Sequence, residues 1–384
     1  MELPKPYGGK LVNRIAPDSE FLSADGMQSI SPSLDEIYDT EKICTGAYSP
    51  LEGFMGEEEY RRVITSDTLP NGLPWTMPII LAPSGENNAK TISGIGKSDE
   101  VLLLDQAHKP FAVLSLEEKF HFDKKEFAEK VYATTDPAHP NVGDIYNLGE
   151  FALGGKVRLI RKLDLPSKKF ELSPSETRAE FQRRGWKSVA AYQARNPPHT
   201  AHEYIQRVTL ERDDVDGLLV QPVVGKLKKG DYRPEIILEA YEAYVSKYFP
   251  SDRVMLASLS ISMRYAGPKA VLFYAIVRRN YGCSHYIVGR DQAGVGNYYD
   301  PYAGHRIFDR FDVGVVPIRY QETFYCKTCG MMASTKTCSH PAEQHVSTSQ
   351  TKIRKILSER GNLPTEILRP EVSKVLSKGD VLIT

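Results

Sequence analysis

Between residues 188 and 316, short apolar runs alternate with longer stretches of helical character. The runs have the length of buried strands, and turn residues bound them. We predict strands at 188–192, 217–220, 254–259, 284–288 and near 314–316, and helices from 199 and at 234–248 and 267–279. This alternation predicts an α/β fold, with a parallel, doubly wound, Rossmann-like sheet that has helices on both faces. Such sheets bind ligands at the carboxyl ends of their strands.

Residues 193–203 continue from the first predicted strand as a turn and the start of a helix, and two consecutive prolines keep the turn extended. The junction is rich in side chains that can donate hydrogen bonds, namely Gln193, Arg195, Asn196, His199 and His202. His199 and His202 are three residues apart, so both imidazoles lie on one face of the first helical turn. Each residue alone could be an ordinary turn or helix-start residue. Together, with almost no carboxylate, they favour a site for a multiply charged anion such as phosphate.

Two further loops lie between a predicted strand and the helix that follows it. Residues 225–231 contain three lysines, and they form either a solvated basic loop or a clamp for phosphate beside the anion site. Residues 263–268 end in Gly267 and Pro268, which are good helix-start residues.

Residues 1–168 have a different pattern, with short apolar runs at 75–81, 101–104, 111–114 and 157–160 between turn residues. One helical stretch, 116–133, interrupts them, so we predict a β-barrel-like domain with helical additions. A linker at 164–169 precedes Ser173, Pro174 and Glu176, which have the spacing of a helix N-cap with a capping box. We therefore divide the chain into domains at 1–168, 169–320 and 321–384.

The C-terminal region holds three of the five cysteines, Cys326, Cys329 and Cys338, at a spacing typical of a structural zinc site. His340 or His345 could supply a fourth ligand. Because Cys338 and His340 would need a tight loop to share one ion, we predict Cys326, Cys329, Cys338 and His345 as ligands of Zn²⁺. Unliganded thiols in a reducing compartment are the alternative.

The composition excludes some classes of protein. Lys and Arg together number 49, as do Asp and Glu, so no overall positive charge attracts nucleic acid. No apolar run reaches the length of a membrane span, and the N-terminus has no apolar signal core. We expect a cytoplasmic protein that binds neither nucleic acid nor membrane.

Several segments together resemble one enzyme family. Residues 193–202 are similar to the Q-x-R-N-P-x-H-x-x-H element of ATP sulfurylase (sulfate adenylyltransferase), and residues 289–296 resemble its G-R-D-H-A-G-V-G element. Residues 46–55 resemble its G-x-F/Y-S-P-L-x-G-F-M element. Weaker likenesses are at 225–231, 263–268, 347–354 and 369–372, so the resemblance runs from about residue 8 to the end.

The resemblance implies a PUA-like N-terminal barrel and an enzyme that transfers the adenylyl group of ATP, accompanied by Mg²⁺, to sulfate. The products would be adenylyl sulfate and pyrophosphate, by direct in-line attack of sulfate on the α-phosphate. The sequence lacks G-x-x-x-x-G-K-[ST], so the prokaryotic type without a fused adenylylsulfate kinase is expected. Members form homo-oligomers, and some bind zinc at the cysteines.

The resemblance also implies roles for individual residues. Sulfate would be held by Gln193, Arg195 and the backbone of Ala293. Catalysis would depend on Arg195, Asn196, His199 and His202. The ATP site would be lined by Gln193, Ala194, Arg195, Asn196, His199, His202, Gly289, Arg290, Asp291 and Gln292.

Two residues depart from the family pattern, because Ala194 stands in place of a threonine and Gln292 in place of the histidine of G-R-D-H. One alternative is therefore another H-x-x-H nucleotidyltransferase with a different acceptor. A second alternative, a nucleic-acid-binding protein with a PUA-like domain and a zinc knuckle, is disfavoured by the zero net charge.

Overall fold

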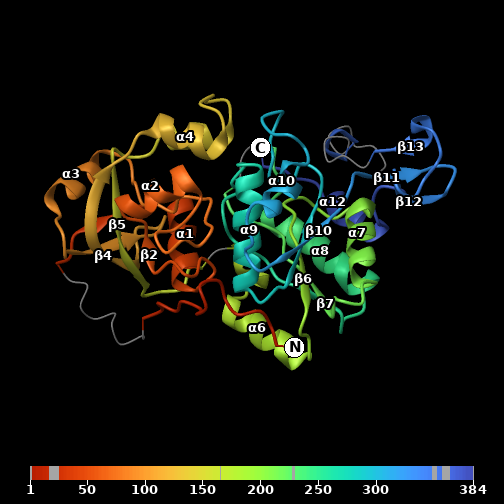
Figure 1. The fold of residues 1–384 in the computed structure, drawn as a ribbon, viewed down its shortest axis with the longest axis horizontal. Helices are drawn as coiled ribbons and strands as arrows, with labels where there is room; N and C mark the ends of the chain where they lie inside the picture. Colours follow the sequence, from red (N-terminus) through yellow and green to blue (C-terminus); the bar gives the residue numbers. More distant parts are fainter. Residues whose placement is uncertain are drawn as a thin grey trace.

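The computed structural model describes residues 2–16, 26–164, 166–226, 230–347, 353–356 and 364–383. Its strands form two five-stranded sheets and one three-stranded sheet. The N-terminal sheet, the central sheet and the small C-terminal sheet succeed one another across the molecule (Figure 1). In the described part of the chain, no helix is both long and apolar enough to cross a bilayer.

The N-terminal sheet has the strand order β1-β3-β4-β5-β2, with β1 parallel to β3 and the other pairs antiparallel. Its strands are β1 Ser29–Ile30, β2 Gly53–Phe54, β3 Glu100–Leu104, β4 Pro110–His121 and β5 Phe151–Leu159. The helices of this region are α1 Leu34–Cys44, α2 Glu57–Ser66, α3 Glu86–Gly94, α4 Lys124–Tyr132 and α5 Pro140–Tyr146.

The prediction of one helix over 116–133 is wrong in its first third. Residues up to His121 belong to β4, which pairs with β5, and α4 begins only at Lys124. Asp123 separates the two elements because its side chain accepts hydrogen bonds from the N–H groups of Lys125 and Glu126. The charged stretch 117–119 has helical propensity, but pairing with β5 overrides it.

The predicted strand at 75–81 is also wrong. Only Leu81 makes an isolated bridge, to Leu153, although most of the segment is buried. Helices α1, α2, α3 and α5 were not predicted; α1 and α2 precede the first predicted strand, and α3 and α5 lie between later ones.

The central sheet is entirely parallel, with the order β10-β9-β6-β7-β8. Its strands are β6 Val189–Tyr192, β7 Gly217–Val220, β8 Val254–Leu256, β9 His285–Val288 and β10 Val316–Arg319. Around it are the 3₁₀ helices η2 Pro166–Phe170 and η3 Ile307–Asp309 and the helices α6 Pro174–Arg183, α7 Thr200–Leu210, α8 Pro234–Tyr248, α9 Pro268–Asn280 and α10 Ala303–Arg306. The predicted parallel sheet is confirmed, with boundaries that shift by up to three residues.

Alternate residues of the central strands enter two separate hydrophobic cores. Val189, Ala191 and Tyr286 pack in one core with α9, whereas Ala190 and Leu218 pack in the other with α7, α8 and α12 (Pro370–Leu376). Because successive side chains of a strand point to opposite faces, helices cover both faces of the sheet. Strands β6, β7 and β9 are buried along their whole length, which explains the continuous apolar runs in the sequence.

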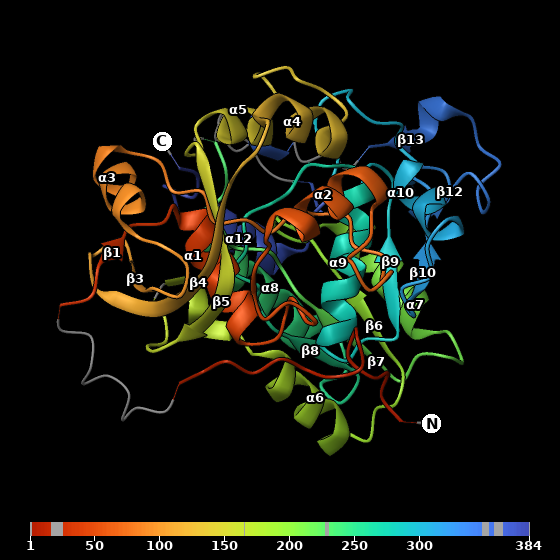
Figure 2. The same cartoon turned by 60° about the vertical axis from the view of Figure 1, so that its left-hand side comes forward.

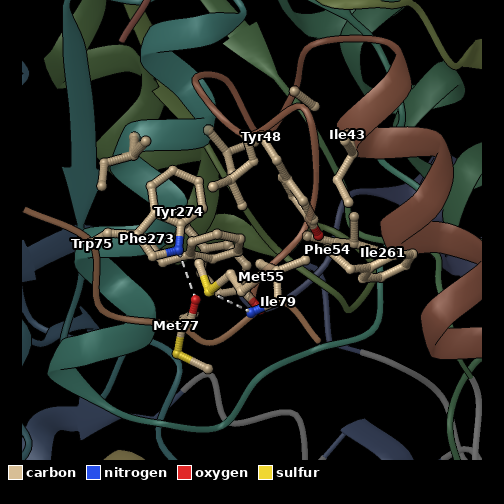
Figure 3. Close-up of a cluster of buried hydrophobic side chains, with 14 of the residues drawn as sticks. Ile43, Tyr48, Phe54, Met55, Trp75, Met77, Ile79, Ile261, Phe273 and Tyr274 are labelled. Carbon is tan, nitrogen blue, oxygen red and sulfur yellow. Dashed lines mark hydrogen bonds between the residues drawn. The ribbon is translucent and has the colours of Figure 1, made fainter. Parts of the chain in front are cut away.

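The first of these cores continues into the N-terminal region. Figure 3 shows Tyr48, Met55 and Trp75 of that region packed with Phe273 and Tyr274 of α9. The ring of Phe273 lies 5.2 Å from Tyr48 and 5.6 Å from Trp75, in edge-to-face geometry. The 46–55 loop is therefore a packed part of the contact between the N-terminal region and α9.

Buried charges join the same two regions. Arg264 donates to both carboxylate oxygens of Asp39 in α1, at 2.7 and 2.6 Å, and both side chains are nearly inaccessible to solvent. Lys42 of α1 pairs with Glu41 and with Glu171, and Lys168 pairs with the same two carboxylates. Lys168 lies in the predicted linker, so these ion pairs attach the linker to α1.

The C-terminal strands β11 Thr323–Cys326, β12 Met331–Ser334 and β13 His345–Val346 form an antiparallel sheet in the order β12-β11-β13, with the 3₁₀ helix η4 Ala342–Gln344 before β13. Both views place this sheet beside α7 and far from the N-terminal sheet (Figures 1 and 2). The chain then returns to the central region, where α12 packs in the same core as α8.

Candidate active site

A pocket of about 460 Å³ opens at the carboxyl ends of β6 and β9. The chain order of the strands reverses between these two neighbours, and open parallel sheets bind ligands at such a point. The residues predicted for the sulfate and ATP sites all line this pocket: Gln193, Ala194, Arg195, Asn196, His199, His202, Gly289, Arg290, Asp291, Gln292 and Ala293. Two segments that are distant in sequence therefore form a single cavity.

Backbone hydrogen bonds hold the turn after β6. The N–H of Gln221 donates to the carbonyl of Tyr192 at 2.9 Å, and the N–H of Val223 donates to the carbonyl of Ala194 at 2.8 Å. The segment after β7 thus runs beside the turn beyond the end of the sheet. This pairing fixes the path of the backbone that carries Gln193 and Arg195.

The C-terminal part of the chain anchors the start of α7. The N–H of Thr200 donates to the carbonyl of Ile367 at 2.9 Å. Arg369 donates to both carboxylate oxygens of Glu203, at 2.7 and 2.6 Å, and Glu203 also accepts from Arg207. A bidentate pair of this kind fixes orientation as well as distance, so the first turn of α7 has a defined position at the pocket.

His199 is the N-cap of α7, and His202 is its third helical residue. Their rings stack with centroids 3.5 Å apart, and Nδ1 of His202 accepts from the backbone N–H of His199 at 3.4 Å. Burial lowers the pKa of His199 to about 3, and burial together with the neighbouring His199 holds the pKa of His202 well below its usual range. Both rings are therefore neutral at pH 7. Since Nδ1 of His202 is an acceptor, its Nε2 carries the proton and can donate.

The low pKa of His199 predicts an acid-sensitive contribution to stability. Between the unfolded pKa of about 6.5 and the folded value of about 3, the imidazole of residue 199 is protonated in the unfolded chain but neutral in the folded one. Stability is therefore lost as the pH falls through this window. Compared with His199→Asn, the wild type should lose up to about 1.4 kcal/mol more unfolding free energy per pH unit below 6.

Urea unfolding between pH 7 and pH 4.5 measures this difference. Asparagine is chosen because it can still cap α7. His108→Asn, which removes a solvent-exposed imidazole, is the matched control. Parallel stability curves for the wild type and His199→Asn would contradict a buried neutral imidazole.

Arg195 lies between a carboxylate and an aromatic ring. Its Nη1 is 3.5 Å from Oδ1 of Asp231, and its guanidinium carbon lies 4.9 Å from the ring centroid of Tyr265. The backbone of Tyr265 is held from the N-terminal region, because its N–H donates to Asn141 and its carbonyl lies 3.0 Å from Nε2 of His139. The N-terminal region therefore supports the aromatic surface on which Arg195 rests.

Arg354 is a site residue that was not predicted from the sequence. Its Nη2 donates to Oδ1 of Asn196 at 3.0 Å and lies 3.8 Å from Oδ1 of Asp231. With its oxygen engaged, Asn196 has its NH₂ group available as a donor. The available signal was the likeness of residues 347–354 to a family element that ends in arginine.

The loop after β9 has two non-glycine residues in the left-handed region, Asp291 at φ 53° and Ala293 at φ 57°. Such conformations are strained and often occur at ligand sites. The carbonyl of Ala293 accepts from the N–H of Gly267 at 3.0 Å, whereas its own N–H donates to no acceptor within the described ranges. That N–H is therefore available for a ligand.

The lysine loop is only partly described. Lys226 pairs with Asp144 at 2.9 Å and Asp35 at 3.3 Å, both in the N-terminal region. Lys228 and Lys229 lie outside the described residues, so a phosphate clamp by these lysines stays a prediction. Met263 and Tyr265 from the 263–268 segment do line the pocket.

The cysteine cluster is a candidate metal centre. Nδ1 of His340 lies 3.5 Å from Sγ of Cys326, 3.3 Å from Sγ of Cys329 and 3.5 Å from Sγ of Cys338. All four donor atoms lie within 4.8 Å of one another. Three sulfurs and one imidazole nitrogen form a donor set that suits tetrahedral Zn²⁺.

The geometry favours His340 over the predicted His345 as the fourth donor of this cluster. Nε2 of His345 approaches only Cys338, at 3.8 Å, and the ring of His345 stacks on Phe324 with centroids 3.6 Å apart. Pairing of β13 with β11 holds His345 in this position. The turn after Ser334 instead allows His340, two residues beyond Cys338, to reach all three sulfurs.

Comparisons with known proteins agree with the geometry. The ATP-sulfurylase family profile matches residues 168–379, and a PUA-like domain profile matches residues 4–162. A sulfate adenylyltransferase of Halothermothrix orenii is 43% identical over 98% of this chain and 99% of its own length. One of Hyperthermus butylicus is 44% identical over 97% of this chain and 96% of its own length.

A solved structure is also similar. The hexameric APS kinase from Thiobacillus denitrificans superposes with a TM-score of 0.78 at 25% identity, over 99% of this chain and 69% of that one. The domain profiles, the full-length relatives and the pocket formed jointly by residues 193–202 and 289–293 lead to one conclusion. The chain belongs to the ATP sulfurylase family, with a PUA-like N-terminal domain.

Proposed function

We propose that this chain transfers the adenylyl group of ATP to sulfate in the pocket at the carboxyl ends of β6 and β9. The observation that carries the proposal is the convergence of residues 193–202 and 289–293 on that one cavity. Its volume of about 460 Å³ is within the usual range of small-molecule sites, about 300–1,000 Å³. The sulfate adenylyltransferase relatives, similar over almost their whole length, support the same reaction.

The sulfate end of the pocket is assigned to Gln193, Arg195 and the backbone N–H of Ala293. Arginine presents its donors in a planar fork that matches two oxygens of a tetrahedral oxyanion. The N–H of Ala293 and the side-chain amide of Gln193 add neutral donors. Sulfate would displace Asp231 from the guanidinium of Arg195, since the two now lie at a loose 3.5 Å.

The nucleotide end is assigned to Ala194, Asn196, His199, His202 and the loop 289–292. Asn196 would donate its NH₂ group to the α-phosphate, because Arg354 engages its oxygen. His202 would donate from Nε2 to the phosphates, and a polyphosphate anion beside the two imidazoles would raise their low pKa. Ala194 offers no hydroxyl, so its contact with the nucleotide is through the backbone.

The reaction needs no general base. A sulfate oxygen attacks the α-phosphorus in line, a new P–O bond forms, and the bond to the β-phosphate oxygen breaks to release pyrophosphate. Sulfate is already ionised, so no proton has to be removed. Rate acceleration would come from holding the two anions together and from donors aimed at the charge of the transition state.

Two metals complete the proposal. Mg²⁺ would enter with ATP and neutralise charge on the phosphates, and such ions need few protein ligands. Zn²⁺ would be held by Cys326, Cys329, Cys338 and His340, with no position left open for chemistry.

The proposal also covers the type of each domain, the domain boundaries and the oligomeric state. The order β8-β7-β6-β9-β10 equals 3-2-1-4-5 in chain order, which supports a Rossmann-like catalytic domain. We place the domains at 1–168, 169–320 and 321–384, with α12 returning to the central core. We infer that the N-terminal sheet is barrel-like, as expected of a PUA-like domain. The hexameric structural neighbour supports a homo-oligomer.

The test is pyrophosphate release from MgATP with and without sulfate, with pyrophosphatase present to draw the reaction forward. We expect release that depends on sulfate, and ATP formation from adenylyl sulfate and pyrophosphate in the reverse direction. Absence of both would overturn the proposal. A screen of other acceptors would then examine the alternative nucleotidyltransferase.

A further inference from the structure

We propose that Tyr286 and Gln292 are positioning residues that orient the side-chain amide of Gln193, so that its NH₂ group faces the oxyanion. This inference rests on the proposed function, because it explains how the amide of Gln193 comes to present its donor group to the proposed sulfate. It also assigns Gln292, which departs from the family pattern, to a structural role within the site.

A chain of three hydrogen bonds carries the proposal. The backbone N–H of Gly289 donates to Oε1 of Gln292 at 2.9 Å. Nε2 of Gln292 donates to the hydroxyl of Tyr286 at 2.6 Å. The hydroxyl of Tyr286 donates in turn to Oε1 of Gln193 at 3.2 Å.

The direction of this hydrogen-bond chain is fixed at its first step. A backbone N–H can only donate, so the group of Gln292 that faces Gly289 must be its oxygen. Its NH₂ group must then face Tyr286, and the hydroxyl, which has one proton, must give that proton to Gln193. The oxygen of Gln193 is thereby engaged, and its NH₂ group is left for the pocket.

The other contacts of these residues agree with this orientation. Among the described residues, Nε2 of Gln193 has only a long contact, 3.8 Å to Sδ of Met263, which an anion would easily replace. Tyr286 is fully buried on β9, and burial raises the pKa of its hydroxyl, so the proton that it donates stays in place. The hydrogen bond from Tyr286 therefore decides which end of the Gln193 amide meets sulfate.

The test is Tyr286→Phe, which removes the hydroxyl and keeps the buried ring. The loss of one oriented hydrogen bond should raise the KM for sulfate about tenfold, while the KM for ATP stays within about twofold. Tyr60→Phe is the matched control, since Tyr60 is also buried and its hydroxyl has no partner in the described part of the chain.

A double-mutant cycle separates positioning from a general structural effect. If Tyr286 acts through Gln193, adding Tyr286→Phe to Gln193→Ala should not raise the KM for sulfate further. Additive effects, equal increases in both KM values, or an unchanged KM for sulfate would overturn the proposal.

Gln292→Met keeps the test decisive if Tyr286→Phe does not fold. Methionine has a similar shape but cannot orient the hydroxyl of Tyr286, so the KM for sulfate should again rise more than that for ATP. A rise confined to the KM for ATP would mean that Gln292 acts only at the nucleotide end, and it would overturn the proposed orientation. Failure of the proposed function itself would be seen separately, as a wild type without sulfate-dependent release.

Discussion

Replacing Arg195 with alanine is expected to lower kcat/KM for sulfate about a thousandfold or more, while the protein stays folded. The guanidinium is the only charged group assigned to the sulfate end of the pocket. It lines the cavity and packs against the ring of Tyr265. Its removal takes away both the charge and the paired donors that meet sulfate. Steady-state kinetics with varied sulfate measures the loss.

The fold should survive because Arg195 is not buried in a core. Its side chain is 30% exposed. In the variant, Asp231 would still have Arg354, at 3.8 Å, as a positively charged neighbour. Thermal melting of Arg195→Ala should therefore lie close to that of the wild type.

Arg195→Lys is the matched variant, because it keeps the charge but loses the planar fork. We expect it to recover only part of the activity. Arg212→Ala, which removes a surface arginine paired with Asp214, controls for the loss of a positive charge. Near-normal turnover by Arg195→Ala would contradict the assignment of Arg195 to sulfate binding.

The local parts of the site could be predicted from the sequence. The junction of β6 and α7 is a continuous segment, so its apolar run, its prolines and its histidine spacing all appear together in the chain. The loop after β9 could be placed beside it because parallel strands present their carboxyl ends at one edge. For this reason the sequence alone already groups together residues that line one pocket in the structure, whereas their roles stay predictions.

Contacts between distant segments could not be predicted in this way. Arg354 meets Asn196 across 158 positions, and Asn141 meets Tyr265 across 124. Nothing in the local pattern of Asn141 distinguishes it from an ordinary polar residue of a helix. The second half of β4 was missed for a related reason, since its pairing with β5 overrides a local charged pattern.

Removal of the proposed zinc from the cysteine centre is expected to unfold the small C-terminal sheet while the central domain stays folded. Only Phe324, Cys326 and Ala333 form the buried apolar cluster of this sheet within the described ranges, which is too little for stability without a cross-link. Structural zinc contributes about 10–16 kcal/mol in small zinc-binding peptides. Cys326→Ser or chelation should therefore make residues 323–346 sensitive to protease and lower the thermal stability.

Initial activity at room temperature should fall less than stability does, because the donors assigned to sulfate and phosphate lie in the turn after β6, at the start of α7 and in the loop after β9. Some loss is expected, since Thr323 of β11 lines the pocket and β11 also carries Cys326.

His340→Ala and His345→Ala form a matched pair for the ligand set. His340→Ala should release zinc, because Nδ1 of His340 lies within 3.5 Å of all three sulfurs. His345→Ala should retain zinc while it loses the stacking contact with Phe324 and the 3.8 Å approach to Cys338. Zinc content of the purified variants, measured with a colorimetric chelator, distinguishes them. The reverse result would restore His345 as a ligand, and a wild type with no bound zinc would mean that the cluster is not a metal centre.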